Sequence, residues 1–514
     1  MKYIKNIPVP VALLMAAGVA LSLAQFLFNR SFYWDEAALA LNIIHRDAGE
    51  LLNPLDYIQV APVLFLQIEK LFSLILPNSE YGLRLFPLLC FWASIWLFYQ
   101  VIRKLLDRNF ISAPHVIVVA LSLFVFSQAF VYYSSEVKQY MTDVFVALCM
   151  FYLVIKDYRK ERTRYWMSGI MGAVFIFLSN VAPVILFTCG LYLMYVHFLV
   201  NRKKNVLPFL AVFSAWLGVF AVYYCLFIHG NPTRDVMVRF WSDRHAFLPP
   251  NPLEKDFYVF LANETARFFV ALYDFKIHAV RTVWRLFFGA FFLSGIVFLI
   301  RDRHIKIMIL ALTPVLLHLL LTALQLYPFQ KRFVLYALPG AIIIFSYGFN
   351  GIVRFVASVL KSEQFGRLAA IACILLSCCC FVMSGFPFTR FEEREAINYV
   401  RKNIKDTESF YVSFYYATSV KYYADIGLIP PDMNISNRWL SNEDIEFWMM
   451  KDIDLRAQLM LNDMKTLRGK NWLLLDKTVN AACIIDKLDS LGYKRLDEFK
   501  TQGTTSVYLY DFGE

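Results

Sequence analysis

Long apolar runs alternate along the chain with short polar connections that are mostly basic. Eleven of these runs have about the twenty residues that a helix needs to cross a bilayer core. They lie at 11–28, 82–102, 114–133, 137–156, 164–179, 181–200, 206–228, 282–300, 307–326, 333–350 and 368–386. Backbone groups in lipid need internal partners, so each run is expected to be a helix. The pattern predicts an all-α polytopic membrane bundle of about 11 transmembrane helices.

Two loops between the apolar runs are long, at 29–80 and 229–281. In the first loop we expect a short helix at 36–46, followed by a helix at 63–76 that contains Glu69 and Lys70. The second helix is too short and too charged to span, so we expect it to lie at the membrane interface. The loop at 229–281 has an apolar periodicity at 257–273 that predicts another interfacial helix.

The composition changes after Pro387, where both signs of charge become frequent. Helices are predicted at 392–404 and 481–491, and strands at 409–413, 471–475 and 506–511. About 125 residues are enough for one hydrophobic core. The chain is therefore expected to comprise a transmembrane domain at 1–387 and a small α/β domain at 388–514.

Composition and charge agree with a membrane protein. The chain of 514 residues is 59% apolar and 17% aromatic, which excludes an ordinary soluble protein. The net charge of +11 comes from basic loops after every second span, which are cytoplasmic by the positive-inside rule, so no nucleic-acid partner is expected. Both long loops and the C-terminal domain would then be extracytoplasmic. Eight of the nine cysteines fall in apolar spans, so no disulfide framework is predicted.

The first candidate for chemistry is the pair Asp35 and Glu36, which follows the first span and is preceded by Tyr33 and Trp34. Burial and like charge both perturb the acidity of such a pair. Adjacent side chains on a helix face different partners, so one carboxylate is expected to do chemistry while the other orients or binds. The alternative is a solvated acidic pair in an external loop.

A second candidate begins at Glu136, at the outer start of the fourth span. On a helix, Glu136, Gln139, Tyr140 and Asp143 would share one face, with Asp143 about 10 Å deeper than Glu136. An ionisable group at that depth usually faces a cavity. The alternative is an interfacial helix cap beside a snorkelling Lys138.

Cations form the third candidate, because Lys331 and Arg332 lie on the outer side, where the topology rule disfavours them. The planar fork of arginine suits phosphate oxygens, and Arg84 at the outer start of the second span is a further candidate. Contact with lipid headgroups is the alternative. Together, the outer carboxylates and cations suit sugar transfer from a lipid phosphate, in which a carboxylate deprotonates the acceptor hydroxyl and cations or a metal stabilise the departing phosphate.

The order of four external motifs resembles the GT-C superfamily of integral-membrane glycosyltransferases. The motifs are Tyr-Trp-Asp-Glu-Ala at 33–37, Gln-Val-Ala-Pro at 59–62, Ser-Glu-Tyr-Gly-Leu-Arg-Leu-Phe-Pro at 79–87 and Ser-Ser-Glu-Val-Lys-Gln-Tyr at 134–140. The resemblance covers roughly residues 1–350. It is closest to the bacterial, family-39-like branch akin to protein O-mannosyltransferases and the lipid A aminoarabinose transferase. The stretch 331–339 is similar to an element near the donor phosphate of that family.

The resemblance implies that Asp35 is the general base, that Glu36 positions the acceptor or a metal, and that Glu136 is a second catalytic acidic residue. It also implies that the donor phosphate is bound by Arg84, Lys138, Lys331 and Arg332. We expect the substrate cavity to be lined by Tyr33, Trp34, Tyr57, Gln59, Tyr140, Asp143 and Tyr336. Several relatives have a histidine or lysine before the first-loop proline, where this chain has Gln-Val-Ala. The sequence therefore leaves open whether a divalent cation binds, with Asp35 and Glu136 as its candidate ligands. No other cofactor is expected.

These observations predict a multi-pass protein of the bacterial inner membrane with an extracytoplasmic active site. It would transfer a sugar, with inversion, from a polyprenyl-phosphate donor to a hydroxyl of a lipid, glycan or protein acceptor. The alternative is a transporter or flippase for a lipid-linked sugar, which would show paired hydropathy repeats and interrupted helices. A third alternative is a non-catalytic membrane scaffold.

Overall fold

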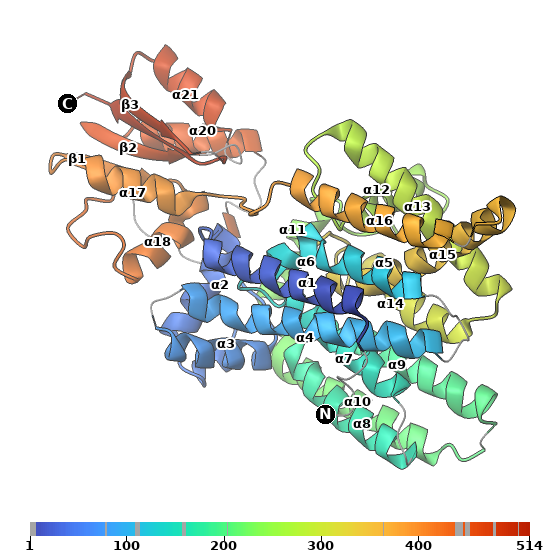
Figure 1. Cartoon of the computed structure of the whole chain (residues 1–514). Helices are drawn as coiled ribbons and strands as arrows, with labels where there is room; N and C mark the ends of the chain where they lie inside the picture. The colour runs from blue at the N-terminus through green and yellow to red at the C-terminus, as the bar shows by residue number, and fades with distance from the viewer. Residues whose placement is uncertain are drawn as a thin grey trace.

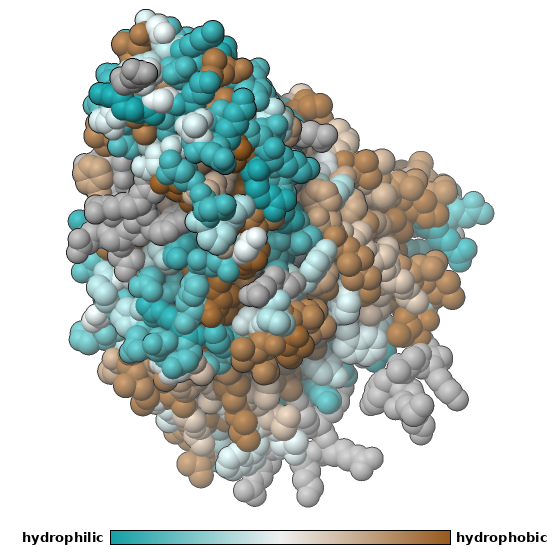
Figure 2. All heavy atoms as spheres, turned by 90° about the vertical axis from the view of Figure 1, so that its left-hand side faces the viewer, coloured by the Kyte–Doolittle hydropathy of each residue, from teal (hydrophilic) through white to brown (hydrophobic). Residues whose placement is uncertain are grey.

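The computed structural model of the chain describes all residues except 1–6, 78–79, 108–113, 157–160, 203, 363, 437–445, 448–452, 476–479, 502 and 514. Most described residues are helical, and the helices form a bundle from which a small α/β domain projects at one end (Figure 1). Figure 2 views the molecule toward this end. Hydrophilic residues predominate on the projecting domain and hydrophobic residues on the bundle.

Every predicted span coincides with a helix of the bundle. The helices are α1 (Val9–Phe28), α4 (Glu80–Asp107), α5 (Pro114–Val125), α6 (Gln128–Tyr133), α7 (Tyr140–Ile155), α8 (Glu161–Leu178), α9 (Ala182–Met194) with η2 (Tyr195–Val200), α10 (Leu207–Tyr223) with η3 (Tyr224–Ile228), α13 (His278–Arg301), α14 (Ile305–Ala323), η4 (Leu335–Ala337) with α15 (Leu338–Leu360), and α16 (Gln364–Met383). Among the described residues, 8 helices are long and apolar enough to cross a membrane, and three predicted spans fall on shorter apolar helices. The chain is therefore a multi-pass membrane protein, while the count of eleven spans stays a prediction.

Close helix packing holds the bundle together. At Gly295 on α13 an added Cβ would clash with the carbonyl oxygen of Ile344 on α15, and at Gly348 it would clash with that of Phe291. Small residues of this kind let helix backbones approach closely in membranes. Nearly all of α7 is buried, and so is the segment 134–139 before it.

The first loop forms α2 (Trp34–His45), η1 (Glu50–Leu52) and α3 (Val63–Ile75), close to the two predicted helices. Helix α2 begins two residues earlier than predicted, because the carbonyl oxygen of Tyr33 accepts the N–H groups of Glu36 and Ala37. Asp35 therefore lies in the first turn of α2, where the positive end of the helix dipole favours carboxylates. Helix α3 buries Glu69 but exposes Leu74, and its place at the membrane interface stays a prediction.

One local prediction was wrong, because residues 136–139 form a turn and α7 begins only at Tyr140. The Val137 N–H donates to the Glu36 side chain, and the Lys138 N–H donates to the carbonyl oxygen of Glu136. These amides are therefore not arranged as a helical turn. Glu136 and Asp143 do not share a continuous helix face as expected.

The long second loop contains α11 (Thr233–Ser242) and α12 (Lys255–Phe269). Helix α12 replaces the helix predicted at 257–273 and ends earlier, because the chain turns at Val270, whose N–H bonds to Arg267 and Phe268. Helix α11 was not predicted. Its apolar residues follow a helical period, but few of its residues are apolar, and Val236 is one of its few buried residues.

The C-terminal domain is a four-stranded mixed sheet between helices. The strand order is β1 (Glu408–Val412), β2 (Lys470–Leu475), β4 (Ser506–Asp511) and β3 (Lys494–Lys500), with β1 and β2 parallel and the other pairs antiparallel. The remaining elements are α17 (Glu393–Asn403), η5 (Phe414–Tyr416), α18 (Ala417–Asp425), α20 (Ile453–Met464) and α21 (Ala481–Ser490). Phe410 packs in the core shared with α17, whereas the next residue, Tyr411, packs with α20 and α21. The three predicted strands and two predicted helices are present, and β3, α18 and α20 were missed.

Helices α17 and α18 face the bundle and dock on its first loop. The Phe32 N–H donates to the Tyr423 hydroxyl at 2.9 Å, and that hydroxyl donates to Glu80, also at 2.9 Å. The Thr418 hydroxyl donates to the carbonyl oxygen of Trp34 at 2.9 Å. The C-terminal domain is thus fixed against the residues immediately before Asp35.

Candidate active site

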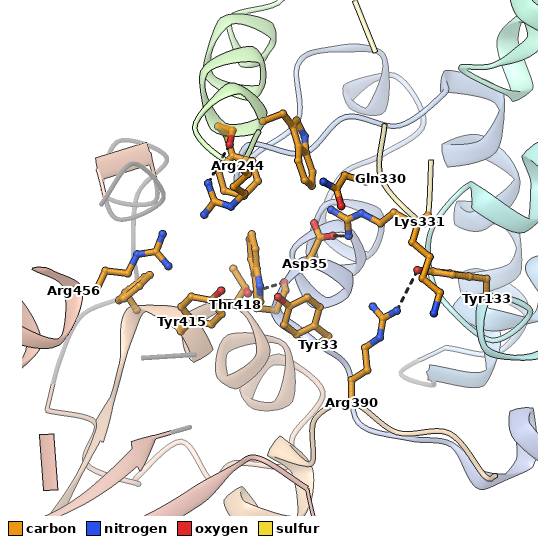
Figure 3. A pocket seen from close by; sticks show the side chains of 15 residues that line it. Tyr33, Asp35, Tyr133, Arg244, Gln330, Lys331, Arg390, Tyr415, Thr418 and Arg456 are labelled. Carbon is orange, nitrogen blue, oxygen red and sulfur yellow. Dashed lines mark hydrogen bonds and ion pairs between the residues drawn. The ribbon is translucent and has the colours of Figure 1, made fainter. Parts of the chain in front are cut away.

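Asp35 lies where two cavities meet. The cationic cavity, of about 360 Å³, is lined by Tyr33, Trp34, Asp35, Tyr133, Phe240, Trp241, Arg244, Gln330, Lys331, Arg332, Arg390, Phe414, Tyr415, Thr418 and Arg456 (Figure 3). The apolar cavity, of about 400 Å³, extends toward α9, α10, η3 and α14 and includes Val184, Phe220, Phe227 and Leu321 in its lining. Trp34, Asp35, Phe240, Trp241 and Arg332 belong to both cavities.

The Asp35 carboxylate is bonded through both oxygens. Its Oδ1 accepts from Lys138 Nζ at 3.0 Å and from Gln59 Nε2 at 3.3 Å, and its Oδ2 accepts from Arg332 at 2.9 Å. Burial alone would raise the pKa of Asp35, but the charges of Lys138 and Arg332 outweigh burial and hold the pKa well below its usual range. The carboxylate is therefore ionised in the free protein.

The two cations on Asp35 are held by their own surroundings. The Arg332 guanidinium lies 5.2–5.6 Å from the ring centroids of Phe333, Trp241 and Tyr140, within the range of cation–π attraction. The Lys138 ammonium also donates to Gln59 Oε1 at 2.6 Å. Both cations line a cavity, so an entering anion can reach them.

A strained turn places Gln59 beside Asp35. Tyr57 and Ile58 both have positive φ, of 60° and 55°. This conformation is costly for a β-branched residue and persists only where packing enforces it. Ile58 is buried against Trp34 and Val236. The turn directs Gln59 toward both Asp35 and Lys138.

Glu36 lies behind Asp35 in a closed network. It accepts from Arg30 at 2.7 Å, from Arg84 Nε at 3.0 Å and from the Val137 N–H at 3.0 Å. Burial opposes ionisation of Glu36, but Arg30 and Arg84 outweigh it and lower its pKa. Arg84 also donates to the carbonyl oxygen of Arg30 and to Asn29. The network ties α2 to the end of α1, to α4 and to the turn before α7.

Glu136 is 2% exposed, and its Oε2 has no hydrogen-bond partner among the described residues. Burial raises the pKa of Glu136, opposed by the nearby Arg390. Arg390 donates to the Tyr133 hydroxyl at 3.1 Å and lines the cationic cavity with Lys331. Burial lowers the pKa of Lys331 to about 8, opposed by Asp274 and reinforced by Arg390.

The structure brings most of the predicted site residues to these cavities. Tyr33, Trp34, Asp35, Gln59, Lys138, Tyr140, Lys331 and Arg332 line one or both. Glu36, Tyr57, Arg84, Glu136, Asp143 and Tyr336 are absent from the described lining of either cavity. Asp143 accepts instead from the Ser179 hydroxyl at 2.6 Å, and the Tyr336 hydroxyl lies 3.1 Å from His318 Nδ1. The catalytic and phosphate-binding roles predicted for these residues remain predictions.

The sequence reasoning missed the residues that line the far side of the cationic cavity. These are Arg244, Arg390, Phe414, Tyr415, Thr418 and Arg456. Arg244 follows α11, and the other five come from the C-terminal domain at 388–514. The only signal in the sequence concerns Arg244, which follows Trp241 in the long loop among other charged residues. Nothing in the sequence shows which surface of the bundle the C-terminal domain contacts.

The residues present do not fit a resident divalent cation. Among the described residues, no group of three or more His, Cys, Asp or Glu side chains is placed to hold a metal ion. Both oxygens of Asp35 bind cationic side chains, and Glu136 is absent from the described cavity linings.

The fold and the site define a polytopic helical membrane protein with a cation-lined chamber at the base of an α/β domain. No family model and no curated protein sequence matches the chain. Among solved structures, the chain is similar to ArnT from Cupriavidus metallidurans in the apo state, with a TM-score of 0.47 and 10% identity over 98% of this chain and 97% of that one. ArnT bound to undecaprenyl phosphate has a TM-score of 0.44 and 11% identity over the same shares.

Arabinofuranosyltransferase AftD from Mycobacteria is also similar, with a TM-score of 0.43 and 11% identity over 98% of this chain and 41% of that one.

Proposed function

We propose that this protein is a membrane glycosyltransferase that takes a sugar from a polyprenyl-phosphate donor and transfers it to an acceptor hydroxyl, with Asp35 as the general base. One observation carries the proposal: a buried, ionised carboxylate lies where a cation-lined cavity meets an apolar one. A donor with a phosphate and a prenyl chain has the same division of polar and apolar parts.

In this proposal each cavity binds a different part of the donor. The apolar cavity takes the first prenyl units against Phe220, Phe227 and neighbouring side chains. Arg332, which lines both cavities, meets the phosphate at the junction, with Lys331 nearby. A soluble nucleotide sugar would leave the apolar cavity unused, and burial of apolar surface supplies much of a lipid's affinity.

Entry of the donor phosphate prepares Asp35 for catalysis. The phosphate competes with Asp35 for Arg332, which loosens one of the two bonds that hold the pKa of the carboxylate low. The freed Oδ2 then accepts the proton of the acceptor hydroxyl as its oxygen attacks the anomeric carbon. The bond from that carbon to the phosphate oxygen breaks, its electron pair leaves with the phosphate, and Arg332 stabilises the charge. Attack opposite the phosphate inverts the anomeric carbon.

Glu36 and Arg84 act as positioning residues in this proposal. Their network, which includes Arg30, fixes the first turn of α2 and therefore the direction of the Asp35 side chain. This assignment replaces the direct contact with phosphate expected of Arg84. Lys138 stays on Asp35 Oδ1 and keeps the carboxylate oriented while Arg332 changes partner.

The test is to purify the full chain with native lipid and identify bound lipid-linked sugars by mass spectrometry. The identified donor is then incorporated into liposomes with the protein. The proposal predicts that the donor is consumed and polyprenyl phosphate is released when acceptor is present. Movement of intact donor between leaflets without consumption would instead establish a flippase. Absence of both activities, with no polyprenyl lipid bound, would contradict the proposal.

A further inference from the structure

Three polar side chains line the end of the apolar cavity that lies next to Asp35. They are Gln139, Tyr140 and Tyr327. Gln139 and Tyr140 directly follow Lys138, whose ammonium binds Asp35. The rings of Tyr140 and Tyr327 both pack edge-on against Phe333, with 5.8 Å and 5.4 Å between centroids. The group therefore lies beside the carboxylate proposed as the base.

Two of these side chains have polar atoms without a partner. Gln139 is only 4% exposed, and its Oε1 accepts no hydrogen bond from any described residue. The Tyr327 hydroxyl is buried and likewise has no partner in the described part of the chain. Buried polar atoms are nearly always paired in folded proteins, because an unpaired one keeps the full cost of losing its water. Two such atoms on the wall of one cavity indicate a ligand that pairs with them.

The chemistry of the two atoms limits the kind of ligand. An amide oxygen only accepts hydrogen bonds, whereas a phenol hydroxyl can donate and accept. An ionised phosphate donates none, so it would leave Gln139 Oε1 unpaired, and a prenyl chain would pair with neither atom. A hydroxyl group both donates and accepts, so the hydroxyl groups of a sugar satisfy both Gln139 and Tyr327.

The proposed donor has its sugar at this position. In that proposal Arg332 binds the phosphate, and its guanidinium lies 5.2 Å from the centroid of the Phe333 ring. The sugar is attached to this phosphate and has to present its anomeric carbon near Asp35. A sugar ring placed there reaches Phe333 and the side chains around it. Aromatic rings beside a few hydrogen-bonding groups suit a hydroxylated ring as ligand.

We propose that Gln139 and Tyr327 form a subsite that recognises the hydroxyl groups of the donor's sugar ring, which packs against Phe333 and Tyr140. This inference rests on the proposed function and adds the residues that select the transferred sugar. Gln139 and Tyr327 determine specificity, and neither of them binds the phosphate or accepts the proton.

The experiment is a binding competition on the full chain in detergent, measured by native mass spectrometry. Undecaprenyl phosphate competes at equal concentration with undecaprenyl phosphate that carries glucose, mannose or arabinose, in the absence of acceptor. The variants are Gln139→Leu and Tyr327→Phe. The matched controls are Gln67→Leu on α3 and Tyr258→Phe on α12, because both residues are absent from the described lining of either cavity.

We expect at least one of the three sugar-bearing lipids to bind the wild type about tenfold more tightly than undecaprenyl phosphate. Each subsite variant should reduce this preference about threefold to tenfold, because it removes a hydrogen bond to the sugar. Affinity for undecaprenyl phosphate should change less than about twofold, and the controls should keep the preference. Tyr327→Phe without lipid should unfold at the wild-type temperature, because the hydroxyl has no partner among the described residues.

Four results would overturn the inference: no preference for any sugar-bearing lipid, an unchanged preference in both variants, an equally large loss of undecaprenyl phosphate affinity, or a lower unfolding temperature of lipid-free Tyr327→Phe. The first of these would leave the proposed phosphate and prenyl sites intact. Conversely, a sugar preference that depends on Gln139 and Tyr327, in a protein that transfers no sugar in liposomes, would refute the transferase proposal while the sugar subsite stands.

Discussion

Asp35 and Glu36 are neighbours in the sequence, yet they belong to different regions of the molecule. The partners of Asp35, Lys138 and Arg332, line cavities and can exchange the carboxylate for another anion. The partners of Glu36, Arg30 and Arg84, have side chains only 2% and 1% exposed. One step along a helix turns a side chain by about 100°. That turn separates a carboxylate that lines both cavities from one that is enclosed by buried arginines.

The largest expected effect is on turnover and concerns Asp35, the carboxylate of the pair that lines the cavities. Asp35→Asn keeps the side-chain shape but removes the proton acceptor, so turnover should fall by about 10³-fold. Undecaprenyl phosphate affinity should be retained, because Arg332 no longer has a carboxylate partner. The assay compares initial rates in liposomes with Asp56→Asn, a half-exposed carboxylate of the same loop, as control. Near-normal turnover of Asp35→Asn would remove it as the base.

The next largest effect is on stability and concerns Glu36, the carboxylate that is buried between Arg30 and Arg84. Glu36→Gln leaves Arg30 and Arg84 buried without a countercharge, which should cost about 3 kcal/mol of unfolding free energy. Thermal unfolding in detergent measures the loss. Turnover per folded molecule should stay within about tenfold of wild type, because Glu36 touches no substrate in this account. A stable Glu36→Gln variant with abolished turnover would show that Glu36 takes part in the chemistry.

A smaller effect is expected at Gln59, which joins Lys138 to Asp35. Gln59→Leu removes the side-chain hydrogen bonds to Asp35, to Lys138 and to the carbonyl oxygen of Tyr57, so the carboxylate is less firmly oriented and kcat should fall about tenfold. The KM for the donor should change little, because Gln59 carries no charge to hold a phosphate. Separate kcat and KM measurements check this. A rise in KM with unchanged kcat would make Gln59 a donor contact.

The smallest effect is a pH dependence through Lys331. Its pKa of about 8 means that the ammonium is charged below that pH and loses its charge as the pH rises through it. Undecaprenyl phosphate affinity should therefore fall about threefold between pH 7 and pH 9. Bound phosphate raises the pKa of Lys331 and moves the midpoint upward. Lys331→Arg should flatten the profile, and a flat profile in the wild type would exclude Lys331 from phosphate binding.

Much of the bundle follows from local rules, which explains why its helices were predictable. A run of about twenty apolar residues leaves few alternatives in lipid, so the helices at the predicted spans fall where expected. The sequence also singles out Asp35, because aromatic residues precede it, and Arg332, because cations are disfavoured on the outer side, while Lys138 was assigned through the family resemblance. Their mutual contact follows from tertiary packing.

The rest of the site depends on contacts between distant segments. Arg456 and Tyr415 reach the cavity only because α17 and α18 dock on the first loop, and no periodicity encodes that docking. The strained turn at Ile58 opposes local preference and is held by packing against α11. Arg84 resembled an anion-binding residue because the sequence does not show that it forms a buried ion pair with Glu36.

The most direct test is a cryo-EM structure of the full chain with undecaprenyl phosphate. The account predicts the phosphate within hydrogen-bonding distance of Arg332, the first prenyl units in the apolar cavity beside Phe220, and Asp35 Oδ2 released from Arg332. A phosphate bound at Arg84, or a prenyl chain outside the apolar cavity with the Asp35–Arg332 pair intact, would contradict it.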